Sequence, residues 1–78
     1  MKNTIKYKGK LNAIGSIIKE YRIKNNYTQE QLAEIINISP RQLQRIEKNE
    51  DKTKIETIRK IIRVLNIPDE EILKYIKK

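Results

Sequence analysis

Two short amphipathic patterns, separated by only one or two residues, constrain this chain more than any other feature. They lie in the stretch TQEQLAEIINISPRQLQRIEKNE, residues 28–50. Thr28 followed three residues later by Gln31 has the pattern of a capping box, so a helix is predicted to begin there. Asn37 is predicted to end it, because asparagine tolerates the left-handed backbone conformation that stops a helix and turns the chain sharply.

The second short helix is predicted to follow almost at once, over residues 40–48. Ser39 is a typical N-cap residue, and Pro40 suits the first helical position, where a missing N–H costs nothing. At 100° per residue, Leu43 and Ile46 face one side of this helix. The other side carries hydrogen-bond donors, from Arg41, Gln44, Arg45 and Lys48. Arginine can bond guanine O6 and N7, and glutamine adenine N6 and N7, so this side fits the reading of bases in a major groove.

Three more segments have helical patterns. Apolar residues recur at spacings of three and four over residues 11–24, and a similar pattern runs over residues 55–65. Pro68, followed by three acidic residues, is predicted to open a last helix. The expected fold is therefore all-α with five helices, in which the two short helices bury Leu32, Ala33, Leu43 and Ile46.

The length and charge of the chain limit its organisation and its partners. Its 78 residues make one domain at most, predicted over residues 11–78, with residues 1–10 as a flexible basic arm. The 18 Lys and Arg against 10 Asp and Glu give a net charge of +8, which suits a polyanion. The sequence has no apolar run of membrane-spanning length and no signal peptide, so we expect a cytoplasmic protein and no membrane partner.

Missing residue types argue against catalysis and against cofactors. The chain has no Cys and no His, and so lacks the thiol nucleophile, the commonest metal ligand and the usual general base. Gly9 and Gly15 cannot form a phosphate-binding loop of the Walker or dinucleotide kind. We therefore expect no enzymatic activity, no cofactor and no metal site.

The stretch IGSIIKEYRIKNNYTQEQLAEIINISPRQLQRIEKNE, continued by IETIRKIIRVLNIPDEEIL, resembles the lambda-repressor-like, Cro-type helix-turn-helix family, also called the xenobiotic response element family of bacterial and phage regulators. The resemblance covers about residues 12–75, and its most specific part runs from TQEQLA through NIS to Glu47. It implies a compact five-helix lambda-repressor-like domain with the helix-turn-helix motif at about residues 28–48. It also implies a DNA-binding regulator, expected to be a repressor that binds an inverted-repeat operator as a dimer.

The same resemblance implies roles for individual residues. The base-reading positions are Gln29, Pro40, Arg41, Gln44 and Arg45, although Gln29 could equally bind a phosphate. Pro40 could touch a thymine methyl group or only start its helix, and the second role is favoured. Arg22 and Glu47 match an ion pair between the first and third helices, and a carboxylate beside the core needs such a partner. The DNA-backbone positions are Thr28, Lys48, Asn49, Lys52 and Lys54.

Exposed apolar residues raise the question of protein partners. Ile72, Tyr75 and Ile76 in the last helix are the expected homodimer contact; alternatively, Ile72 and Ile76 only cover the domain's own core. Ile17 and Ile35 occupy positions where the family tolerates polar residues, so a protein partner could bind there. The alternative function is therefore a protein-interaction module, such as the antitoxin of a toxin-antitoxin pair.

Overall fold

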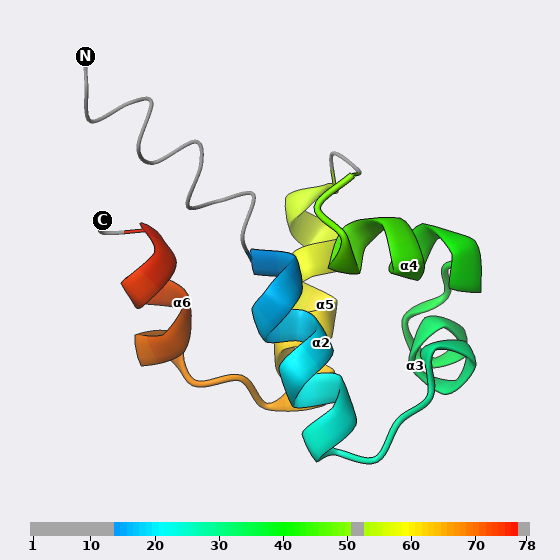
Figure 1. Cartoon of the computed structure of the whole chain (residues 1–78), viewed down its shortest axis with the longest axis horizontal. Coiled ribbons are helices and arrows are strands. Elements are labelled where there is room, and N and C mark those ends of the chain that lie inside the picture. The colour runs from blue at the N-terminus through cyan, green and yellow to red at the C-terminus, as the bar shows by residue number, and fades with distance from the viewer. Residues whose placement is uncertain (1–13, 51–52, 77–78) are drawn as a thin grey trace.

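The computed structural model describes residues 14–50 and 53–76, with side chains as far as residue 73. Five helices and no strand make up this part of the chain, which confirms the expected all-α fold. The proposed basic arm, together with Lys52, lies outside the described residues. The helices, labelled as in Figure 1, are α2 (Ile14–Lys24), α3 (Gln29–Ile36), α4 (Pro40–Glu47), α5 (Ile55–Leu65) and α6 (Asp69–Ile76).

Helix α2 is the centre of the arrangement, because it contacts α4, α5 and α6. The two short helices α3 and α4 contact each other and lie together on one side of α2 and α5, whereas α6 lies on the other side (Figure 1). The side chain of Asn25 joins the ends of α2 and α5, since its Nδ2 donates to the Leu65 carbonyl at 3.2 Å. Helix α4 packs against α2 and α3, and its other side is exposed to solvent.

The core is almost entirely aliphatic and draws on every helix from α2 to α5. The predicted burial of Leu32, Ala33, Leu43 and Ile46 is confirmed, as each is no more than 3% exposed. Burying such side chains stabilises a fold by roughly 1.5–3 kcal/mol each relative to leaving them in water. The remaining core residues are Ile17, Ile18, Ile36, Ile61, Leu65 and Ile67.

The expectation that Ile17 is exposed is wrong. This side chain is only 1% exposed and belongs to the core. The reason is that α2 is covered by three helices, so its buried face is wider than the single apolar stripe visible in the sequence. Ile35 is 51% exposed, so of the two apolar residues considered for a protein partner only Ile35 is available.

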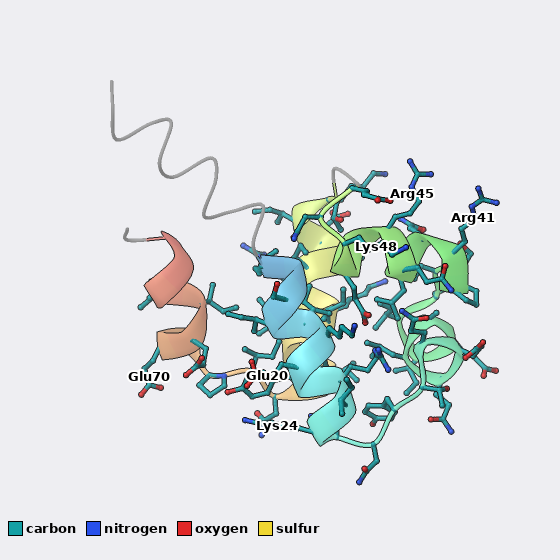
Figure 2. The ribbon with its side chains drawn as sticks, viewed as in Figure 1. Glu20, Lys24, Arg41, Arg45, Lys48 and Glu70 are labelled. Carbon is teal, nitrogen blue, oxygen red and sulfur yellow. The ribbon has the colours of Figure 1, made fainter. Side chains whose placement is uncertain are left out.

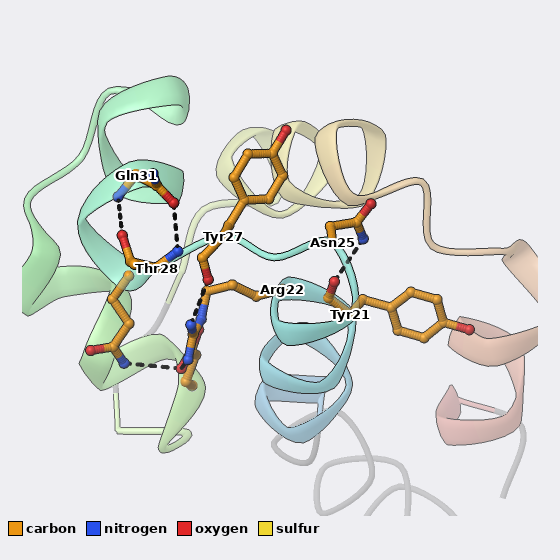
Figure 3. A network of polar contacts seen from close by, with 8 residues as sticks. Tyr21, Arg22, Asn25, Tyr27, Thr28 and Gln31 are labelled. Atoms are coloured by element: carbon orange, nitrogen blue, oxygen red, sulfur yellow. Dashed lines mark hydrogen bonds and ion pairs between the residues drawn. The ribbon is translucent and has the colours of Figure 1, made fainter.

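The two short helices begin as their capping residues predict. Thr28 Oγ1 accepts from the Gln31 backbone N–H at 3.0 Å, and Gln31 Oε1 accepts from the Thr28 N–H at 2.9 Å, which completes the capping box (Figure 3). Ser39 Oγ accepts from the Gln42 N–H at 3.1 Å, and Pro40 is the first residue of α4. Both starts therefore depend on groups within three residues of the helix end.

Four helices end in the same way, at an asparagine in the left-handed region. Among the described residues, asparagines and no glycine have a positive φ there, and Asn37, with φ 65° and ψ 46°, behaves as predicted. Asparagine occupies this region more readily than other residues that carry a Cβ. The four positions are Asn26, Asn37, Asn49 and Asn66.

Candidate nucleic-acid interface

The outward side of α4 is a row of long polar side chains. Arg41, Gln44, Arg45 and Lys48 are all exposed, while Leu43 on the opposite side is fully buried. Figure 2 shows Arg41 and Arg45 projecting away from the body of the molecule, on the side that carries α4. The apolar side of α4 therefore anchors the helix and leaves its donors free to meet a ligand.

These donors border a shallow hollow and have no partner among the described residues. In residues 14–50 and 53–76, the side chains of Arg41, Gln44 and Arg45 take part in no hydrogen bond or ion pair. Arginine and glutamine can each form two parallel hydrogen bonds to one base edge, and arginine also binds phosphate. The residues around the hollow are Arg41, Gln44, Arg45, Lys48 and Glu50.

A buried ion pair fixes the far end of α4 against α2. Arg22 Nε donates to Glu47 Oε2 at 2.6 Å, and Arg22 Nη2 to Oε1 at 3.3 Å, with the two side chains 10% and 3% exposed. Arg22 Nη1 also donates to the Tyr27 carbonyl at 2.9 Å, and Gln29 Nε2 donates to Glu47 Oε1 at 3.0 Å (Figure 3). In the described part of the chain no buried side-chain N or O atom lacks a partner. The pair thus meets the condition for a tolerable buried charge, full hydrogen bonding.

A glycine allows α2 to approach the end of α4 closely. A Cβ atom at Gly15 would lie 2.4 Å from the Ile46 carbonyl oxygen and 2.7 Å from that of Glu47, both of them backbone atoms. The Gly15 N–H donates to Asn49 Oδ1 at 3.0 Å, so the residue that turns the chain after α4 also caps the start of α2. The orientation of α4 is therefore set by backbone contact as well as by the ion pair.

Several residues assigned to DNA contact have partners inside the protein. Gln29 is half-buried and its amide bonds Glu47, Thr28 is engaged in the capping box, and Asn49 Oδ1 is held by Gly15. Pro40, Lys48 and Lys54 are exposed. The structure therefore brings together one exposed cluster along α4, whereas Gln29, Thr28 and Asn49 already make hydrogen bonds within the domain.

The expected dimer residues lie far from this cluster, in α6. Ile72 is half-buried against the core, and its neighbour Leu73 is 45% exposed. The side chains of Tyr75 and Ile76 lie outside the described ones.

Sequence reasoning missed Gly15 and Glu50 as parts of this region. A glycine inside an otherwise helical pattern does suggest close packing, and that pattern could have drawn attention to Gly15. Glu50 had no such pattern around it, because its place beside the cations of α4 depends on the turn at Asn49.

Comparison with known proteins gave a family match that covers most of the domain. A model of the helix-turn-helix family matches residues 18–72, more than half of the chain. None of the curated proteins and none of the solved structures compared with the chain gave a match. Within residues 14–50 and 53–76, every helix is too short or too polar to cross a membrane. The match includes all of α3, α4 and α5 and most of α2.

Proposed function

The chain belongs to the helix-turn-helix family of lambda-repressor-like, Cro-type DNA-binding regulators, and we propose that it is a sequence-specific repressor that acts by occupying an operator in double-stranded DNA. One observation carries the proposal. Arg41, Gln44 and Arg45 are exposed donors without a partner in the described part of the chain, on a helix whose other side is buried. A cationic surface of this kind is suited to duplex DNA, and no described side chain of the protein forms an ion pair with it.

In the proposed complex, α4 lies in the major groove with its amino-terminal half toward the bases. Arg41 and Arg45 bond guanine O6 and N7, and Gln44 bonds adenine N6 and N7. Lys48 and Lys54 bind phosphates, where a compact ammonium group serves as well as a planar one. Pro40 starts the helix, and Gln29 donates one amide hydrogen to Glu47 and uses the other to bind a phosphate.

We further propose that two copies bind together. An eight-residue helix reads only a few base pairs, whereas two such helices about 34 Å apart read successive turns of one side of the duplex. The operator is then an inverted repeat with half-sites about 10 base pairs apart. Helix α6 supplies the contact between copies, through Ile72, Tyr75 and Ile76, and the exposed Leu73 extends this surface.

The function is tested by selecting bound duplexes from a random DNA pool. The expected result is a shared motif with inverted symmetry, and binding that weakens by orders of magnitude between about 50 and 200 mM salt. Failure to recover any motif, or a flat salt response, would contradict the proposal.

Alanine variants then test the assignment of residues. Arg41→Ala, Gln44→Ala and Arg45→Ala should each cost roughly 1–3 kcal/mol on the selected site and much less on random DNA. Lys54→Ala should weaken both duplexes alike, because it removes only a phosphate contact. Identical behaviour of all four variants would show that α4 does not read bases.

The dimer is tested with Leu73→Glu and with the double variant Tyr75→Glu, Ile76→Glu. Sedimentation should show loss of the dimer, and gel shift should show loss of tight binding, while helical circular dichroism is retained. A dimer that survives both changes would place the interface elsewhere.

A second candidate function, a protein-interaction module such as an antitoxin, is favoured by one observation. Ile35 is 51% exposed beside a shallow hollow that Tyr27, Gln31 and Glu34 also border. The DNA selection separates the candidates, since an interaction module without operator binding would yield no shared motif.

A further inference from the structure

The residue that follows the turning asparagine has the same backbone role at four helix ends. In each case its N–H donates to the carbonyl five residues earlier, which is the longer of the two bonds of a Schellman motif. The four bonds are Tyr27 to Arg22 at 3.1 Å, Ile38 to Ala33 at 2.9 Å, Glu50 to Arg45 at 2.8 Å and Ile67 to Ile62 at 3.0 Å.

At three of these ends the side chain at this position serves the fold. Tyr27 and Ile38 pack against the core, and Ile67 belongs to it with 4% exposure. An apolar contact from this position back to the last helical turns is a regular part of the motif and stabilises it.

The end of α4 departs from this rule. Glu50 occupies the same backbone position, but its side chain is exposed and has no hydrogen bond or ion pair in the described part of the chain. The backbone at Glu50 is nevertheless held in position by two hydrogen bonds. The Glu50 N–H donates to the Arg45 carbonyl, and the Gly15 N–H donates to Oδ1 of the preceding Asn49. Packing therefore gives no reason for a carboxylate here.

The surroundings of Glu50 suggest another reason. Its side chain borders the hollow formed by Arg41, Gln44, Arg45 and Lys48, and among the described residues around that hollow it is the only acidic one. Resting on the proposed function, we propose that Glu50 is a specificity-determining residue, which weakens binding to phosphates and accepts a hydrogen bond from a cytosine amino group in the operator.

The physical basis is that binding to random DNA depends on charge more strongly than binding to the operator does. Binding to random DNA depends on phosphates, and a carboxylate beside the phosphate-binding cations repels them. At the operator the same carboxylate can accept from cytosine N4, one of the few donors in the major groove. Glu50 therefore lowers the affinity for random DNA more than the affinity for the operator.

The test compares Glu50→Gln with a matched control, Glu70→Gln. Both substitutions raise the net charge by one and keep the side-chain shape, but Glu70 lies in α6, at the opposite side of the molecule from Arg41 and Arg45 (Figure 2). The dissociation constants of the wild type and both variants are measured for the selected duplex and for a random duplex at two salt concentrations. Thermal melting by circular dichroism is measured in parallel.

Glu50→Gln should bind random DNA roughly 3–10-fold more tightly, and its preference for the selected site should fall about tenfold. A second DNA selection with this variant should lose a cytosine from the motif. Glu70→Gln should change both affinities by less than about twofold, because salt screens charges beyond roughly 10 Å.

Three outcomes would overturn the inference, and they can be told apart. If the wild type binds no duplex, the proposed function fails and this inference fails with it. If the wild type binds but Glu50→Gln and Glu70→Gln behave alike, only the role of Glu50 is wrong. If Glu50→Gln weakens binding to both duplexes together with a lower melting temperature, Glu50 is a structural residue.

Discussion

The two sides of α2 are held by different kinds of contact. On the side of α4, the contacts are directional: the Arg22–Glu47 ion pair, the Gly15 backbone in contact with the end of α4, and the bond from Gly15 to Asn49. On the side of α6, an apolar contact comes from the half-buried Ile72, which packs against the core. Helix α6 lies on the opposite side of α2 from α4 (Figure 1).

This difference matters because the two kinds of contact specify geometry unequally. Hydrogen bonds and close backbone approach fix an angle, whereas apolar burial is non-directional. A helix that reads bases must be placed accurately, since a shift of about 1 Å in a binding group is enough to spoil a designed site. A helix held against a core by apolar contacts tolerates more variation in its angle. We expect the stability of the domain to depend more on the contacts at α4 than on those at α6.

The largest loss is expected on the α4 side, from Glu47→Ala. The change leaves the Arg22 guanidinium buried without a counter-charge, which typically costs about 3–5 kcal/mol. Urea unfolding measures the loss. As a control, the double variant Arg22→Met, Glu47→Leu should be close to neutral or more stable, because apolar residues of similar volume avoid the desolvation of both charges. If the single variant loses less than about 1 kcal/mol, the pair does not hold α4.

A smaller loss is expected from Gly15→Ala. Alanine favours a helix over glycine by roughly 1 kcal/mol, but the new Cβ would meet backbone oxygens of α4, and such overpacking costs about 1–3 kcal/mol. Ser16→Ala, at the exposed neighbouring position, should be neutral or slightly stabilising. Stabilisation by Gly15→Ala would show that the two helices can separate at little cost.

On the α6 side, Ile72→Ala should cost about 1–2 kcal/mol, below the 2–5 kcal/mol usual for a fully buried isoleucine. The side chain is only half-buried, so its removal leaves no closed cavity. Thermal melting measures the change, with Ile23→Ala, at a position that is 56% exposed, expected within about 0.5 kcal/mol of the wild type. A loss equal to that of Glu47→Ala would remove the contrast between the sides.

The smallest expected effect is the difference in stability between glycine substitutions at two of the asparagine turns, Asn66 and Asn49. Glycine adopts the left-handed region without strain, so Asn66→Gly should change stability by only a few tenths of a kcal/mol. Asn49→Gly should cost about 1 kcal/mol more, because it also removes the acceptor of the Gly15 N–H. Paired unfolding curves measure this difference, and equal losses would mean that the bond to Gly15 contributes nothing.

Much of the fold could be predicted because the sequence specifies its helix ends locally. The capping box at Thr28, the N-cap at Ser39 and the left-handed Asn37 each depend on residues within a few positions, and each is present in the structure. The Arg22–Glu47 pair, whose residues are 25 positions apart, was suggested by resemblance rather than by any local pattern.

The rest depends on tertiary packing that a single sequence does not display. Ile17 is buried because three helices cover α2, and a helical stripe does not say how many neighbours a helix has. Gly15 lies beside Asn49 only because α2 meets the end of α4, since the two residues are 34 positions apart in the sequence. Glu50 follows Asn49 directly. The exposed row on α4 could be predicted from the sequence, whereas the contacts of Gly15 that hold the end of α4 against α2 could not.

The four asparagine turns have a consequence for how quickly the chain folds. Each turn is closed by a bond that spans only five residues, so no long loop must be closed before a helix acquires its end. Helical domains dominated by such local contacts fold in microseconds to milliseconds. A temperature-jump measurement should find that range here, and a relaxation in seconds would contradict it. Synthesis of these 78 residues takes roughly 4–16 s at ordinary rates, so the domain should fold in far less time than its synthesis takes.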